Sequence, residues 1–168
     1  MTLNNEALIK RDRLRFTKNK LSANLTLLAI VCNALYFISL YSTDISTYYY
    51  NVMIGVSVVY NLLFMLISFL SSEGVKSYKL GYSFVLMALG VGQIIRIFVM
   101  PMAAKNAIGE VSGVSVPAMD DGQFIYITVL LVASAALCIV AGIVNFFKTR
   151  ALESYQAELD KKAKGSKT

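Results

Sequence analysis

An arginine and a glutamine one helical turn apart have the side chains best suited to binding an anion. Arg96 and Gln93 both stand in an apolar segment in which Arg96 is the only charge. Guanidinium and amide groups offer several N–H donors, and together they suit a single anionic ligand. Two further amides, Asn33 and Asn61, stand in other apolar segments. These four side chains are the candidate ligand or polar-path residues.

A structural interpretation of the same residues stays open. Arg96 stands about four residues, or ~6 Å, before the expected end of its apolar segment, so its long side chain could reach the outer headgroups. It could instead pair with Asp44, Asp120 or Asp121. The amides could bond to one another in a dry interior, since a lone amide in hydrocarbon costs several kcal/mol.

Residues that usually support catalysis or metal binding are scarce in this chain. It has no histidine, and its two cysteines, Cys32 and Cys138, both stand inside apolar segments. Adjacent Asp120 and Asp121 suit the N-terminal cap of a helix better than a calcium site, which needs more oxygen ligands. We therefore expect no cofactor, no metal site and no enzymatic activity, and an enzyme acting on lipid is the least favoured alternative.

The elements that position these residues are four long apolar segments. The chain has 168 residues, of which 57% are hydrophobic and 15% charged. A bilayer core of ~30 Å is crossed by about 20 apolar residues in a helix. We place the spans near 22–42, 48–71, 79–100 and 123–147. The sequence thus predicts an all-α, polytopic membrane protein, with residues 1–168 forming a single domain and a compact four-transmembrane-helix bundle.

Lysine and arginine residues predict the orientation of the spans. They concentrate in segment 1–20, in the loop between the second and third spans and in tail 148–168, whereas the loop near 101–122 has only Lys105. Both termini are therefore predicted to be cytoplasmic. The tail is expected to continue the last helix. The basic segments favour anionic lipid headgroups as partners rather than nucleic acid. A bacterial cytoplasmic membrane is expected, because the sequence offers no targeting signal or outer glycosylation acceptor.

Each span carries one stripe of small and polar residues at helical spacing. Helices in lipid associate through close packing of small residues and through interhelical hydrogen bonds, so the stripes are expected to face one another. The stripes comprise Ser22, Thr26, Ala29, Asn33 and Tyr36; Tyr50, Ser57, Asn61 and Ser68; Gly81, Ala88, Gly92 and Arg96, with Gln93 beside them; and Ser134, Cys138, Ala141, Gly142 and Asn145.

Two functions are compatible with these features. The first is a non-enzymatic integral membrane protein that acts as a subunit, scaffold or accessory factor of a membrane complex. The alternative is a small homo-oligomeric channel or transporter for an anion or polar solute, with Arg96 and the amides along its path. The expected partner is accordingly a second copy of the chain or another membrane protein.

Overall fold

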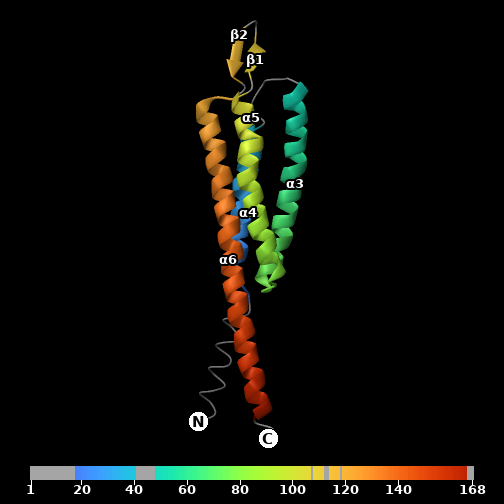
Figure 1. Ribbon diagram of the computed structural model, residues 1–168, viewed down its shortest axis with the longest axis vertical. Coiled ribbons are helices and arrows are strands. Elements are labelled where there is room, and N and C mark those ends of the chain that lie inside the picture. Colours follow the sequence, from blue (N-terminus) through green and yellow to red (C-terminus); the bar gives the residue numbers. More distant parts are fainter. Residues whose placement is uncertain (1–17, 41–47, 107, 112–113, 118, 166–168) are drawn as a thin grey trace.

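Four long helices form the molecule. The computed structural model describes residues 18–40, 48–106, 108–111, 114–117 and 119–165. The helices are α2 (Lys20–Leu40), α3 (Tyr48–Lys76), α4 (Gly81–Val99) and α6 (Asp121–Gly165), packed as a bundle (Figure 1). Each contains a stretch long and apolar enough to cross a membrane. The predicted all-α fold with four spans is therefore confirmed, and it indicates an integral membrane protein.

The segment between α4 and α6 contains regular structure that the sequence predicted only as a loop. Helix α5 (Pro101–Asn106) is followed by an antiparallel hairpin of β1 (Ile108–Val111) and β2 (Val114–Pro117). Only Met100 separates α4 from α5. Its backbone N–H donates to the backbone carbonyl oxygen of Arg96 at 3.0 Å, which continues the helical hydrogen bonding of α4. The apolar helix consequently runs from Gly81 to Asn106 rather than ending near residue 100.

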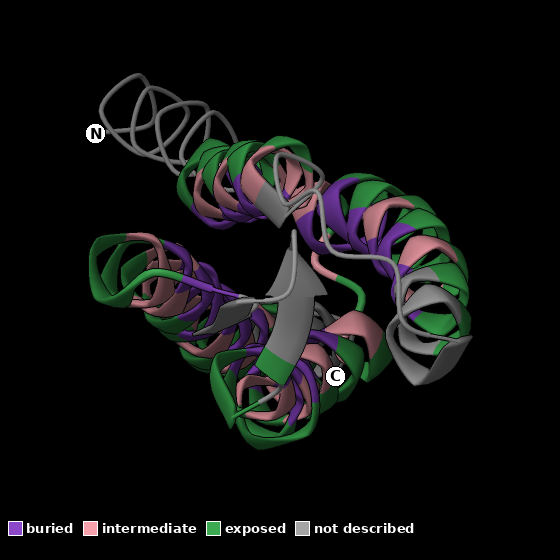
Figure 2. Cartoon of the chain, turned by 90° about the horizontal axis from the view of Figure 1, so that it is seen from above, coloured by how far each residue is buried: buried purple, intermediate pink, exposed green. Residues whose placement is uncertain are grey.

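The buried faces of the helices are turned toward one another around the bundle (Figure 2). Helix α2 contacts α3 and α6, and α4 packs extensively against α6 but less extensively against α3. Two glycines allow the close approach of α4 and α6. A Cβ atom on Gly90 would lie 2.9 Å from the Ala135 carbonyl oxygen, and one on Gly142 would lie 2.8 Å from the Ser83 carbonyl oxygen. Such small residues let helix backbones meet in lipid.

The structure buries the polar stripes of α2, α3 and α6, although the side chain of Tyr50 lies outside the described residues. The stripe of α4 is different, because Gly81 and Ala88 are exposed and Gly92 is half-buried. Leu86 faces inward instead and packs with buried residues of the other helices. Bulky apolar contact therefore sets the rotation of α4. Its buried residues are Ser83, Leu86, Gly90, Gln93 and Arg96.

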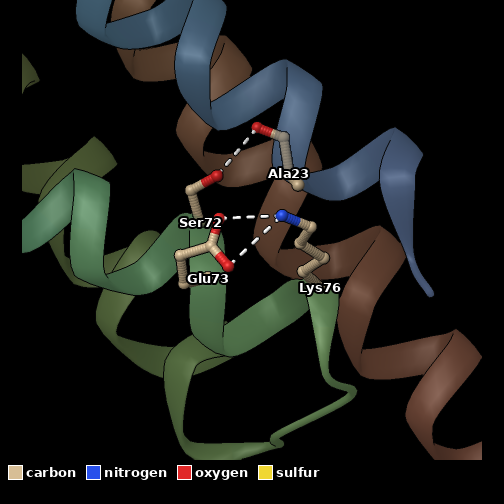
Figure 3. A network of polar contacts seen from close by, with 4 residues as sticks. All are labelled: Ala23, Ser72, Glu73 and Lys76. Atoms are coloured by element: carbon tan, nitrogen blue, oxygen red, sulfur yellow. Dashed lines mark hydrogen bonds and ion pairs between the residues drawn. The ribbon is translucent and has the colours of Figure 1, made fainter.

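The C-terminal end of α3 shows how polar groups divide between the interior and the surface. The Ser72 hydroxyl donates to the Ala23 carbonyl oxygen of α2 at 3.2 Å (Figure 3). The next residue, Glu73, pairs with Lys76 one turn later at 2.9 Å, and this carboxylate is more than half exposed. The hydroxyl thus connects two helices, whereas the ion pair remains at the surface of α3.

Candidate functional site

Arg96 is the centre of a polar cluster inside the bundle. It is 5% exposed, and its guanidinium donates to side chains of two other helices. Nη1 donates to Oδ1 of Asn61 at 2.7 Å and to Oδ1 of Asn33 at 3.2 Å. Nη2 donates to the Ser57 hydroxyl oxygen at 2.6 Å. A single side chain of α4 therefore connects α2 with α3.

The structure brings together all four residues that the sequence nominated as ligand or polar-path residues. Gln93 Nε2 donates to Oδ1 of Asn33 at 3.0 Å, so this oxygen accepts from two residues of α4. Ser57, which the sequence assigned only to the packing stripe, completes the set of acceptors. Two consecutive turns of α4 thus present donors to one layer of the bundle.

Two tyrosine rings also contact the guanidinium. Arg96 Cζ lies 4.3 Å from the ring centroid of Tyr36 and 4.7 Å from that of Tyr60. Aromatic faces attract cations, and the attraction strengthens where water is excluded. The sequence placed Tyr36 on the stripe of α2 without a ligand-binding role and gave Tyr60 no role. Residue spacing within one helix does not reveal a ring that reaches a neighbouring helix.

No carboxylate pairs with Arg96 in the part of the chain that the structure describes. The ion pairs there are Lys76–Glu73, Lys105–Asp121 and Arg150–Glu153. Asp121 therefore pairs with Lys105, and Asp44 lies outside the described residues. The suggestion that Arg96 reaches the outer headgroups is wrong, because its side chain is buried. The apolar stretch also continues for ten residues after Arg96, to Asn106, rather than for about four.

Around Arg96, the described buried side chains have more hydrogen-bond donors without a partner than acceptors without a partner. Among the described residues, Arg96 Nε, Asn33 Nδ2 and Asn61 Nδ2 are buried donors without a hydrogen-bond partner. Gln93 Oε1 is the matching buried acceptor without a partner in this layer. An excess of N–H groups around a guanidinium suits an anionic ligand, because a carboxylate or phosphate supplies acceptors only.

A cavity of about 160 Å³ reaches Arg96 from the side of the bundle, between α3 and α4. Its rim includes Val56 and Ile95, which are 59% and 58% exposed. The opening therefore faces the surroundings of the helices, which in a membrane are lipid. The residues that line the cavity are Val56, Ser57, Tyr60, Gly92, Ile95, Arg96, Val99 and Met100.

Gly92 gives Tyr60 the space to lie over the guanidinium. A Cβ atom at Gly92 would lie 2.9 Å from the Tyr60 hydroxyl oxygen, which is too close for an unperturbed contact. Gly92 was expected to serve helix packing, and in the structure it lines the cavity beside Arg96. The absence of a side chain at this position thus helps to shape the site.

The remaining stripe residues make contacts between helices. The Ser134 hydroxyl of α6 donates to the Ala29 carbonyl oxygen of α2 at 3.0 Å. Cys138 is buried and Cys32 is half-buried, and both are free thiols. Gly142 lies against α4. These contacts position the helices without adding a group to the Arg96 cluster.

A second polar cluster lies near the other end of the bundle. Asn145 Oδ1 accepts from Asn19 Nδ2 at 3.0 Å, and Asn145 Nδ2 donates to the Ser83 hydroxyl oxygen at 2.8 Å. Lys148 Nζ donates to Oδ1 of Asn19 at 3.1 Å. The sequence placed Asn145 on a stripe but missed Asn19, because Asn19 precedes the apolar segment.

No group of three or more metal-ligating side chains occurs among the residues that the structure describes. Comparison with protein-family models, with curated proteins and with solved structures finds no match to this chain. The functional argument therefore depends on the geometry of the Arg96 cluster and its cavity.

Proposed function

We propose that this protein is a non-enzymatic four-pass membrane protein that acts as a subunit or accessory factor of a membrane complex. The observation that carries the proposal is the cavity between α3 and α4. It opens sideways, and it connects a buried guanidinium with an apolar rim. Such an opening suits a membrane-embedded partner more directly than a solute that enters along the bundle axis.

The use of the interior polar groups supports the same proposal. The side chains of Asn33, Asn61 and Ser57 bond to Arg96, and Asn145 bonds to Asn19 and Ser83. These hydrogen bonds connect helices, and in membranes such bonds specify register and partner. The bundle is thereby a fixed scaffold that presents the α3–α4 face.

Native mass spectrometry of the mildly extracted full chain tests this proposal. We expect the tagged protein, taken from the membranes of the organism that encodes it, to carry a stoichiometric second polypeptide or further copies of itself. A bare monomer under conditions that preserve a known control complex would contradict the proposal.

One observation favours a second candidate, a homo-oligomeric channel or transporter for an anion. Arg96 Nε, Asn33 Nδ2 and Asn61 Nδ2 are buried donors without partners in the described part of the chain. Donors of this kind also line anion-selective paths. Proteoliposomes test it: chloride or phosphate flux that Arg96→Gln abolishes would favour the channel. Absence of flux in liposomes that retain the folded protein would remove it.

We further propose that both termini are cytoplasmic and that the protein belongs to a bacterial cytoplasmic membrane. The distribution of Lys and Arg along the sequence supports this orientation. The α3–α4 turn and the far end of α6 lie at the same end of the molecule (Figure 1). Reporter fusions at residue 168 and within the hairpin test the orientation, and an external reporter at residue 168 would reverse it.

The basic segments at this end are proposed to contact anionic headgroups. Segment 1–17 lies outside the described residues, whereas Lys148 and Arg150 are placed on α6. Each basic residue near an anionic surface contributes about 1 kcal/mol of attraction. The amount of phosphatidylglycerol that co-purifies with the protein should fall at high salt. An unchanged amount would contradict this electrostatic contribution.

A further inference from the structure

Among the described residues, Arg96 contacts only neutral side chains. The contacts to the guanidinium come from the side chains of Asn33, Asn61 and Ser57 and from those of Tyr36 and Tyr60. None of the ten acidic residues of the chain stands within residues 22–40, 48–72, 81–106 or 122–147. A buried charge is stabilised most by an opposite charge at hydrogen-bonding distance. The guanidinium therefore lacks an ionic partner in the described part of the chain, and only an anion can provide one.

The unused donor of the guanidinium belongs to a residue that lines the cavity. Arg96 Nε is buried and has no acceptor among the described residues. The edge of a guanidinium that contains Nε presents donors in the fork geometry that matches a carboxylate. Because this nitrogen is buried, an anion on the α3–α4 side reaches it only where the apolar side chains that line the cavity move aside.

The depth of Arg96 distinguishes a carboxylate on a membrane-spanning helix from a lipid headgroup. Lys105 and Asp121 form an ion pair at 3.1 Å, which marks the polar end of this half of the bundle. Lys105 follows Arg96 by nine positions, which corresponds to an axial rise of ~13 Å. Lipid headgroups lie outside the hydrocarbon core, whereas a residue of a transmembrane helix can stand at any depth within it.

The surface beside the cavity fits a helix. A second shallow groove on α3 shares Val56 and Tyr60 with the cavity and is also lined by Gly55, Val59 and Leu63. A Cβ atom at Gly55 would meet nothing within 4 Å, so a neighbouring backbone has room to approach. Exposed Val56 and Val59 have stiff side chains, which lose little rotamer freedom on packing.

We propose that the α3–α4 cavity receives the aspartate or glutamate side chain of a transmembrane helix from a different protein, with Arg96 as its anchor. This inference rests on the proposed function as a subunit. A second copy of the chain offers no acid within these four apolar stretches, so we assign the partner to a different protein. The partner is therefore an otherwise apolar membrane helix with one acidic residue about 13 Å below its polar end, matching the depth of Arg96.

Model helices of defined sequence test this specificity. The full chain is reconstituted in phosphatidylcholine vesicles with a labelled leucine–alanine helix of about 24 residues. The helix contains one Asp at the matching depth, and two control helices have Asn or Leu there. Energy transfer between protein and helix reports association. We expect the Asp helix to associate about tenfold more tightly than the Leu helix, because interhelical polar contacts of this kind contribute one decade in affinity.

Variants of the protein locate the interaction. Arg96→Gln should abolish the preference for Asp, and Arg96→Lys should retain part of it. Since Arg96→Gln could also loosen the bundle, Val56→Phe provides an independent test: it fills the cavity and leaves the hydrogen bonds of Arg96 in place. It should also abolish the preference. Phe98→Leu is the matched control, because Phe98 is 63% exposed on α4 and does not line the cavity.

Three results would overturn the inference. The first is equal association of the Asp, Asn and Leu helices. The second is an Asp preference that persists in folded Val56→Phe. The third is Arg96-dependent binding of phosphatidylglycerol or oleate with no selection of the Asp helix, which would assign the cavity to lipid. Failure of the proposed function is distinct from these, since a monomer in native membranes would leave the model-helix result unchanged.

Discussion

Arg96 Nη1 donates to Asn61 Oδ1 at 2.7 Å, and this bond joins α4 to α3, against which α4 packs less extensively than against α6. The same nitrogen also donates to Asn33 of α2. Removal of either acceptor would leave a buried charged donor with fewer partners. The stability of the α3–α4 face should therefore depend strongly on these amides.

Asn61→Leu is predicted to lower the free energy of unfolding by about 1–3 kcal/mol, because a buried donor of Arg96 loses its acceptor. Thermal unfolding in detergent measures the effect. Ser68→Ala is the matched control: Ser68 is also buried on α3, and its hydroxyl has no partner among the described residues. An equal loss of stability in the two variants would show that the hydrogen bond to Arg96 does not contribute measurably to the free energy of unfolding.

Asn61→Asp is predicted to keep the thermal midpoint at or above that of the parent protein. The substitution places a carboxylate at the acceptor position of Arg96 and so supplies the missing negative charge. It should also weaken binding of the Asp model helix, because the guanidinium then has an internal partner. A midpoint as low as that of Asn61→Leu would argue against a charge imbalance at Arg96.

The contact between Tyr60 and Arg96 predicts a difference between two substitutions. Tyr60→Phe keeps the ring 4.7 Å from Arg96 Cζ, whereas Tyr60→Leu removes it. Tyr60→Leu should therefore lose about 0.5–2 kcal/mol more stability than Tyr60→Phe, as measured by chemical unfolding in mixed micelles. Equal stabilities would show that apolar volume alone matters at this position.

The close contact between α4 and α6 predicts that replacing glycine by alanine at their interface lowers the stability of the bundle. Gly90→Ala and Gly142→Ala each place a Cβ atom within 3 Å of a backbone oxygen of the neighbouring helix. Each should destabilise the bundle by about 1–3 kcal/mol. Gly55→Ala is the control, since its Cβ atom has free space and alanine favours the helix. A similar response at all three glycines would contradict the close approach of α4 and α6.

Asn145 is predicted to be important for the second polar cluster. Asn145→Leu removes the acceptor for Asn19 and the donor to Ser83, and it should lower the free energy of unfolding by about 1–3 kcal/mol. Ser154→Ala on the exposed part of α6 should have no measurable effect, because its bond is to Ala151 of the same helix. Thermal unfolding of both variants in one detergent checks the prediction.

The four spans were predictable from the sequence because long uncharged segments have few structural alternatives in lipid. The rotation of α4 about its own axis was harder to predict from the sequence. Small residues suggested that Gly81 and Ala88 face inward, whereas Leu86 occupies the interior because the other helices leave a volume that a bulky side chain fills. Periodicity finds the candidate faces of a helix, but the space offered by neighbouring helices selects one of them.

The candidate site was predictable in part. Arg96, Gln93, Asn33 and Asn61 stand out because polar residues are rare in apolar spans. The contribution of Tyr60 was not evident, since tyrosines are common in this chain and its position follows from the space at Gly92. The sequence prediction ended the third span near residue 100, whereas the apolar helical stretch continues through Pro101 to Asn106, since proline is well tolerated in the first turn of a helix such as α5.

Helix α6 has 45 residues and continues well beyond Thr149, whose hydroxyl donates to the Tyr78 carbonyl oxygen in the α3–α4 turn at 3.3 Å. The seventeen residues from Thr149 to Gly165 extend ~24 Å at the usual helical rise. This segment extends past the other helices of the bundle (Figure 1), so a protein bound at its tip is held away from them. Any tilt of α6 within the membrane is correspondingly magnified at that tip.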